Sequence, residues 1–384
     1  MGFWYSWSAA LDRGDWRRFY ALTGCDYLPG YLYVLWFLGK IQLGIAHAPG
    51  LVRAVAPSQD LLYKLPAMAA DAATVGLIYL MGRRWRREGA GLLAATGYAV
   101  NPGVIFNSSR WGQVDSIPAF FMVLAVVLLI EDKPGWCGIA LAVSIVCKPT
   151  ALVLVAPSVA LLAARRQYKA SLAFCGGGIL TSIAAFAPFV PRGTNFFQFI
   201  VHTYSFMAGE FPFLTVNAFN AWMLDQGLLG LVPNSSTILG IDDHVVGWGM
   251  LILLSLVGCA ALFLRLRASE SIQDRRILLP IASVLLVGFF MLLTGMHERH
   301  LLPALPMLAL TCVFWPRYWV PYLWLSFSYF LNLRFVFIMG LPHGRRDLSL
   351  GAILGLAVIN LVMLCMLVVL LLYLIRGPRK RSVI

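Results

Sequence analysis

Long apolar runs alternate with short polar segments along almost the whole chain. The runs cover residues 61–81, 89–107, 116–131, 135–147, 149–164, 170–190, 247–266, 277–295, 301–316, 318–337 and 349–375. A helix needs about 20 residues to cross the hydrocarbon core of a bilayer, and most of these runs approach that length. The pattern therefore predicts an all-α polytopic membrane protein with a bundle of about 11 transmembrane helices.

Two neighbouring runs, 135–147 and 149–164, are shorter than a full span and are separated by Lys148-Pro149. Proline interrupts helical hydrogen bonding, and it biases the preceding residue away from the helical region. One kinked span and two short spans both fit this pattern. Irregular backbone at such a depth is tolerated where protein or a water-filled cavity surrounds it.

The basic residues decide between these two topologies. They cluster at residues 83–87, 165–169, 265–276, 317 and 376–381. Cytoplasmic loops carry an excess of Lys and Arg, so these clusters should share the cytoplasmic side. They do so only if 135–147 and 149–164 cross separately. The formal net charge of +13 is then explained by topology and requires no nucleic-acid partner.

Composition excludes the other broad classes. The chain is 60% hydrophobic and 12% charged, whereas soluble domains carry about 25% charged residues. Of its seven cysteines, only Cys25 lies outside an apolar run, so no framework of disulfides is predicted.

The same topology divides the chain into four segments. Residues 1–60 form an outer loop with interfacial helices, including the aromatic run 27–46, and 61–190 hold the N-terminal transmembrane helices. Residues 191–246 form a large, aromatic outer loop of short helices over a cavity, and 247–384 hold the C-terminal helices and a basic cytoplasmic tail. Because nothing before residue 61 is predicted to cross, we expect one further helix upstream of Met1, and thus 12 in an untruncated chain.

Polar residues that this topology does not require gather in the predicted outer segments. They occur at residues 26–31 (D-Y-L-P-G-Y), 101–102 with 107–116, Lys148, and 297–300 (H-E-R-H). The first motif also suits a plain helix start, because Asp is a good N-cap and Pro fits the first turn. Lys148 could reach the outer headgroups or could bind a phosphate. The polar residues at 107–116 favour a binding surface over a simple loop.

The H-E-R-H motif invites comparison with a zinc site. Metalloproteases use H-E-x-x-H, and here the spacing is H-E-x-H. Two histidines three residues apart can share a helix face, but no third ligand is apparent. No metal site is predicted, and the requirement for a divalent metal is left open. Histidine and arginine that together bind a phosphate or pyrophosphate are the favoured interpretation.

In chain order, these motifs resemble those of the GT-C glycosyltransferases, polytopic enzymes that use polyprenyl-phosphate sugars as donors. The resemblance is closest to bacterial relatives of GPI-anchor mannosyltransferase II, and more distant to the dolichyl-phosphate-glucose-dependent glucosyltransferases of N-glycan assembly. It rests on residues 26–31, which depart from a D-Y-P-P-G-Y pattern at Leu28, on 101–102 with 111–116 (W-G-Q-V-D-S), on Lys148, on 217–222 (N-A-F-N-A-W) and on 297–300. These motifs span nearly the whole chain.

The resemblance implies a mannosyl- or other hexosyltransferase that moves a sugar from a polyprenyl phosphate to an acceptor hydroxyl on the outer face, with inversion and with no obligatory cofactor. In such enzymes an aspartate about seven residues before a tryptophan matching Trp7 is the general base, which places it upstream of Met1. Within the chain the catalytic candidates are Asp26 and Asp115. The predicted substrate-binding residues are Tyr27, Trp111, Gln113, Lys148, Asn220, His297, Glu298, Arg299 and His300.

A transporter or flippase of lipid-linked saccharides is the alternative. Such a protein would carry ionisable or helix-breaking residues near mid-membrane in corresponding halves. Here the polar motifs gather at outer ends and the halves show no symmetry, which favours the enzyme. The predicted partners are the lipid bilayer, a lipid-linked sugar donor and a glycan, lipid or protein acceptor. The predicted location is a bacterial inner or plasma membrane, with the site on the extracytoplasmic side.

Overall fold

The computed structural model describes residues 2–226, 232–266, 271–341 and 347–376. Parts of two predicted basic segments, residues 267–270 and 377–381, lie outside the described residues. Nearly all described elements are helices. The strands among them are two residues long: β1 Thr215–Val216, β2 Thr237–Ile238, β3 Ile241–Asp242 and β4 Met296–His297. The predicted all-α polytopic fold is confirmed.

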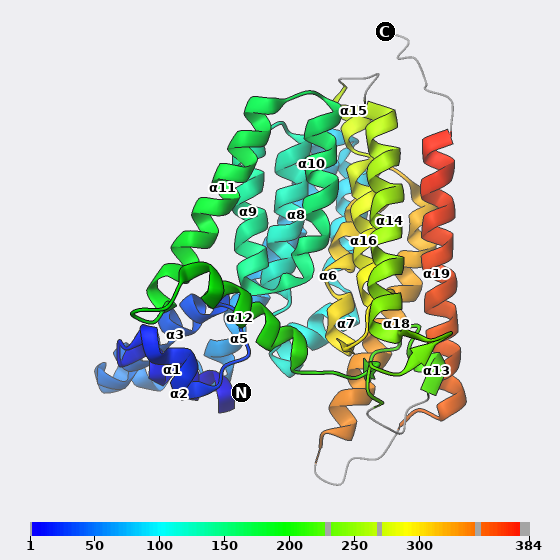
Figure 1. Ribbon diagram of the computed structural model, residues 1–384. Coiled ribbons are helices and arrows are strands. Elements are labelled where there is room, and N and C mark those ends of the chain that lie inside the picture. The colour runs from blue at the N-terminus through cyan, green and yellow to red at the C-terminus, as the bar shows by residue number, and fades with distance from the viewer. Residues whose placement is uncertain (1, 227–231, 267–270, 342–346, 377–384) are drawn as a thin grey trace.

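Each of the eleven predicted apolar runs forms helix. In chain order they are α5 Gln59–Trp85; α6 Glu88–Ala99 with α7 Pro102–Ile105 and the π-helix Phe106–Trp111; α8 Ser116–Ile130; α9 Pro134–Cys147; the 3₁₀ helix η3 Pro149–Leu154 with α10 Val155–Ala164; α11 Tyr168–Phe186; α14 Asp243–Leu266; α16 Leu278–Leu292; α17 Ala304–Cys312; α18 Trp319–Met339; and α19 Leu350–Arg376. Figure 1 shows them side by side in a bundle, with the last turns of α19 at one end.

These helices are not all long enough to cross a membrane. In the described parts of the chain, five helices are long and apolar enough to cross a membrane, or six if α6 and Pro102–Trp111, bent by 46°, count as one span. The shorter helices include α8 and α16, whose side chains are almost entirely buried. A helix surrounded by protein does not have to match the thickness of the bilayer, because its neighbours satisfy the irregular backbone at its ends.

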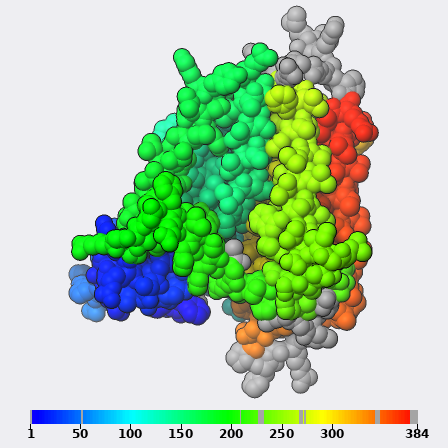
Figure 2. Space-filling view, in the orientation of Figure 1, coloured from blue at the N-terminus to red at the C-terminus, as the bar shows by residue number. Residues whose placement is uncertain are grey.

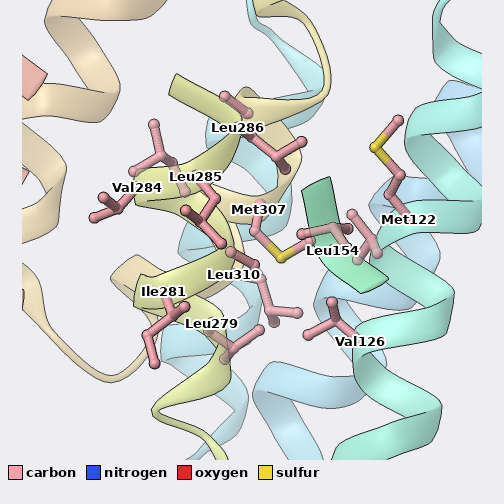
Figure 3. Close-up of a cluster of buried hydrophobic side chains, with 14 of the residues drawn as sticks. Met122, Val126, Leu154, Leu279, Ile281, Val284, Leu285, Leu286, Met307 and Leu310 are labelled. Atoms are coloured by element: carbon pink, nitrogen blue, oxygen red, sulfur yellow. The ribbon is translucent and has the colours of Figure 1, made fainter. Parts of the chain in front are cut away.

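The centre of the bundle is built around α16 and α17. Leu279, Leu285 and Leu310 are fully or almost fully buried there. Figure 3 shows side chains of α16 and α17 directed toward residues from η3 and α8, among them Leu154 and Met122. A helix that is apolar all round is expected in such a position, because no face of it prefers water.

One end of the bundle collects the basic loops. The guanidinium groups of Arg165 and Arg275 lie 3.0 and 3.6 Å from Asp132, and Arg276 donates to the carbonyl of Trp85 (3.0 Å). Because Asp132 precedes α9 and Arg165 follows α10, the chain crosses the bundle and returns between them. The runs 135–147 and 149–164 therefore form two separate segments of the bundle that run in opposite directions, and Lys148 lies at the turn between them, opposite the basic loops.

The opposite end carries a second group of helices. These are α1 Gly2–Asp12, α2 Phe19–Thr23, α3 Pro29–His47, α4 Gly50–Val55 and α12 Phe196–Gly209. Helices α1, α2, α3 and α12 lie together beside the bundle in Figure 1, and their aromatic side chains share a core separate from that of α16 and α17. Besides α12, the loop 191–246 contains α13 Met223–Gln226 and the antiparallel pair β2–β3.

Gly30 fixes the position of α3 against α9. A Cβ atom at residue 30 would lie 2.7 Å from the carbonyl carbon and oxygen of Val146 and 2.8 Å from the nitrogen of Cys147, all of them backbone atoms. Only glycine therefore allows the start of α3 to touch the end of α9. The contact places residues 26 and 27 beside Lys148.

We expect Gly30→Ala to destabilise the protein by about 1–3 kcal/mol, because overpacking displaces backbone. Thermal unfolding of the detergent-purified protein measures this effect. Gly44→Ala, on the same helix with open space around its Cβ, is the control and should be neutral or slightly stabilising. Equal melting temperatures for the two variants would contradict the close contact.

Candidate active site

A cavity of about 640 Å³ lies where α10, α12 and α14 meet the segment that joins α16 to α17. The hollow is visible between α12 and α14 in Figure 2. Its lining changes character along its length. Charged and polar side chains surround one part, which we call the polar mouth: Asp26, Tyr27, Lys148, Glu210, His297, Arg299 and His300. The rest, which we call the apolar slot, lies between η3–α10 and α14.

The apolar slot is formed by one face of α14 and the facing side of η3. Leu251, Ile252 and Leu256 line it from α14, and Leu152 lines it from η3. The side chains of Ile252, Leu256 and Leu152 are 54%, 62% and 50% exposed, so the slot opens on the apolar outside of the bundle. Toward the basic end, α14 packs against its neighbours, since Leu262 is fully buried, and the slot ends there.

Lys148 forms a buried ion pair with Asp115. Its ammonium group bonds to the carboxylate of Asp115, and the two side chains are only 12% and 1% exposed. Because Pro149 follows, Lys148 adopts extended backbone at the end of α9, which separates it from the helical turns on either side. Burial lowers the pKa of Lys148 below its ordinary value, and the nearby carboxylate of Asp115 opposes that shift. This burial does not fit the alternative in which Lys148 reaches the headgroups.

The H-E-R-H motif is held by short strand pairing. Residues 215 and 216 of β1 pair in parallel with Met296 and His297 of β4, and η5 Glu298–Leu301 follows. Glu298 is buried and does not line the cavity. Its carboxylate oxygens lie 3.4 Å from Nη1 of Arg299 and 3.9 Å from Nδ1 of His297. Glu298 therefore orients Arg299, which does line the cavity.

Burial disfavours the charged form of both histidines of the motif. The backbone N–H of His297 donates to Nδ1 of His300 (3.4 Å), and the ring of His297 stands edge-on to Phe211, with 4.4 Å between centroids. Burial, with the charges of Arg299 and Lys148, lowers the pKa of His297 to about 2. Burial and Lys148 also hold the pKa of His300 well below its ordinary value. Nε2 of His297 is buried and makes no hydrogen bond within the described parts of the chain.

Asp26 and Glu210 meet at the polar mouth. Asp26 precedes α3, and Glu210 follows the last turn of α12. Both side chains line the cavity. Partial burial, followed by the charge of Asp26 and hydrogen bonding to its carboxyl group, raises the pKa of Glu210 to about 7. Sequence reasoning missed Glu210, because it belongs to no motif. The only hint was its position at the end of an aromatic segment.

Tyr27 lies beside this pair and lines the cavity. Its ring packs edge-on against Trp4, with 5.0 Å between centroids, and its carbonyl accepts a hydrogen bond from the hydroxyl of Tyr20 (2.9 Å). The aromatic core of α1–α3 thus fixes the turn that presents Asp26.

Besides Glu298, three of the predicted substrate-binding residues do not line the cavity. Trp111 packs on Phe337, with 5.6 Å between ring centroids, and the backbone N–H of Gln113 donates to the carbonyl of Asn107 (2.9 Å). Asn220 is fully buried and donates to the carbonyls of Phe290 and Leu293, each at 3.3 Å. Asn220 therefore anchors the end of α16 just before the H-E-R-H motif.

Other cavity residues were not predicted from the sequence. They include Tyr204 on α12 and, on α14, His244 and Trp248. Nδ1 of His244 lies 3.1 Å from the hydroxyl of Thr294. Among the residues that the structure describes, no three His, Cys, Asp or Glu side chains are grouped as metal ligands would be.

Comparison with known proteins identifies the family. The family model of glycosyltransferase family 87 matches residues 48–295, nearly two thirds of the chain. The match includes Asp115, Lys148 and Glu210, whereas Asp26 and the H-E-R-H motif fall outside it. No curated protein matches the sequence. The chain thus belongs to glycosyltransferase family 87 and is a polytopic membrane glycosyltransferase.

Proposed function

We propose that the enzyme transfers a hexose, with mannose as the first candidate, from a polyprenyl phosphate to an acceptor hydroxyl. The observation that carries this proposal is the joining of the apolar slot and the polar mouth in one cavity. A polyprenyl-phosphate sugar has the same order of parts: an apolar chain, a phosphate and a sugar. The resemblance to bacterial relatives of GPI-anchor mannosyltransferase II supports the same donor class.

Lys148 and Arg299 would bind the donor phosphate. They are the cations that face the polar mouth within the described residues. Charge-assisted hydrogen bonds from Lys and Arg to phosphate are short and strong, and they gain strength where water is excluded. In the tautomer that carries its proton on Nε2, His297 can donate one further hydrogen bond. The same contacts stabilise the charge that develops on the departing phosphate.

The donor already carries a good leaving group, so direct displacement with inversion needs chiefly a base for the acceptor hydroxyl. Asp115 is engaged by Lys148 and does not line the cavity. Its role is to hold the lysine in place. Asp26 lines the cavity and is the better placed of the two predicted catalytic aspartates.

The polar mouth lies at the end of the bundle opposite the basic loops. By the positive-inside rule this end faces away from the cytoplasm. We therefore assign the reaction to the extracytoplasmic face of a bacterial inner or plasma membrane. Segments 1–60 and 191–246 cover the site on that face, and segments 61–190 and 247–384 form the membrane-embedded body.

The proposal is tested with purified protein in lipid vesicles, radiolabelled polyprenyl-phosphate mannose and a membrane extract as the source of acceptors. We expect label to pass to an acceptor, and we expect none to pass from a nucleotide-linked mannose. Transfer from the nucleotide donor alone would contradict the proposed donor class. Movement of labelled donor across the vesicle membrane without any glycosylated product would favour the transporter alternative.

A pair of adjacent residues on α14 tests the apolar slot. Ile252 lines the cavity, and Leu253 is exposed beside it without lining it. Ile252→Trp fills the slot, and we expect kcat/KM for the polyprenyl donor to fall by about tenfold or more, as for a loss of about 1.4 kcal/mol. Leu253→Trp should leave it unchanged. Equal activity in both variants would show that the lipid chain binds elsewhere.

A further inference from the structure

We propose that Glu210 and Asp26 act as one carboxyl pair that takes the proton from the acceptor hydroxyl. Glu210 would thus be a second catalytic residue, supplied by the large loop. This inference rests on the proposed function and names the residues that perform its proton transfer.

The two carboxyl groups come from segments far apart in sequence that the fold brings together. Asp26 is presented by the turn between α2 and α3, and Glu210 follows the last turn of α12. Packing between these segments fixes their relative position. Phe199 of α12 packs edge-on against Tyr20 of α2, with 5.8 Å between ring centroids, and the hydroxyl of Tyr20 in turn holds the turn after Asp26.

The pair lies where the acceptor must approach. Both carboxyl groups line the polar mouth together with Lys148 and Arg299, the residues proposed to hold the phosphate. A hydroxyl bonded to the pair would therefore lie next to a sugar whose phosphate is bound by these cations. The apolar slot leads away from the mouth along α14, so the donor chain and the acceptor need not compete for space.

The surroundings allow the pair to hold and release one proton near neutral pH. Partial burial and the neighbouring carboxyl of Asp26 raise the pKa of Glu210, while the charge of Arg299 opposes the shift. A base whose pKa lies close to the working pH combines a sufficient deprotonated fraction with a strong tendency to accept a proton. The other titratable groups that line the cavity are Tyr27 beside Asp26, Cys147 and Lys148 at and after the end of α9, Tyr204 on α12, His244 and Cys259 on α14, and His297, Arg299 and His300. The thiol of Cys25 is buried and does not line the cavity; burial, with the charges of Asp26 and Glu210, raises its pKa.

The proposed step is a direct displacement at the anomeric carbon. The acceptor oxygen forms a bond to the anomeric carbon as the bond from that carbon to the phosphate oxygen breaks. The bonding electron pair leaves with the phosphate, which Lys148 and Arg299 stabilise. The acceptor proton passes to the carboxylate of the pair, so that no further reactant is required.

Glu210→Gln tests this inference. We expect the variant to bind tritiated polyprenyl phosphate like the wild type, because the slot and the cations are unchanged, and to lose about 10²–10⁴-fold in kcat, as for removal of a general base. In the wild type kcat/KM should rise with pH through about 7, because the pair must lose a proton to act as a base. This rise should be absent from the residual activity of Glu210→Gln. Asp26→Asn should behave in the same way.

Asp225→Asn is the matched control, because Asp225 is an exposed carboxylate in the same loop that does not line the cavity. It should keep full activity and the wild-type pH profile. If the wild type transfers the sugar and Glu210→Gln keeps full activity with an unchanged pH profile, the role of the carboxyl pair is overturned and the proposed function stands. A wild type that neither binds the polyprenyl donor nor transfers its sugar would overturn both.

Discussion

Lys148→Met is expected to abolish sugar transfer and to destabilise the protein, whereas adding Asp115→Asn should restore stability without restoring activity. The lysine has two separate functions in this interpretation. It neutralises a carboxylate that is 1% exposed, and it faces the cavity where we place the donor phosphate. Removing one partner of a buried ion pair costs about 3–5 kcal/mol, because the other charge is left unpaired. Removing a group that stabilises charge in a transition state costs about 10²–10³-fold in kcat.

Thermal unfolding and radiolabelled sugar transfer separate the two effects. The single variant should show a lower melting temperature and no measurable transfer. The double variant should show a near wild-type melting temperature, but its transfer activity should still be lost. Lys133→Met, an exposed lysine just before α9 at the basic end, is the control and should change neither. Wild-type transfer by the double variant would show that Lys148 only balances Asp115.

Arg299→Ala and His297→Ala are expected to abolish or nearly abolish transfer, by about 10²-fold or more, while the protein still assembles in the membrane. Both side chains line the cavity, and the guanidinium of Arg299 is held 3.4 Å from the buried Glu298. Burial already raises the pKa of Glu298, so without Arg299 this carboxyl can take up a proton instead of remaining as an unpaired charge. The stability cost should therefore be smaller than that of Lys148→Met.

Size-exclusion chromatography of the detergent-solubilised variants reports assembly, and the sugar-transfer assay reports function. Arg299→Lys separates charge from geometry. It keeps the charge but loses the planar fork that binds phosphate through two hydrogen bonds, so partial activity is expected. Retained activity in both alanine variants would remove the H-E-R-H motif from the site.

Much of the architecture could be predicted from the sequence, because it follows from solvation. Apolar runs located the helices, and the basic clusters identified the turn at Lys148 by requiring α9 and η3–α10 to cross separately. The lengths of the helices were less predictable. Since α16 and α17 lie among other helices, the bilayer does not set their length, and hydrophobicity alone could not distinguish them from spans exposed to lipid.

The site was predicted in part, and the reasons are physical. Lys148 and the H-E-R-H motif stood out because charged groups at these positions need a compensating partner or a function. Asn220 belongs to an equally distinct motif, yet its amide group donates hydrogen bonds to the backbone carbonyls at the end of α16. A motif does not show whether its polar atoms serve a ligand or the fold. Glu210 reaches the cavity only through the packing of α12 on α2, which no local pattern reveals.

The opening of the apolar slot along α14 has a consequence for how the enzyme is supplied. On the proposed function, a lipid that leaves the slot passes between exposed apolar side chains and enters the hydrocarbon without crossing water. The rate then depends on the mole fraction of the donor in its leaflet. Diluting the donor with other lipids slows the reaction even when the total amount of donor in the sample stays constant. The spent carrier is released into the same pool, where it competes with fresh donor.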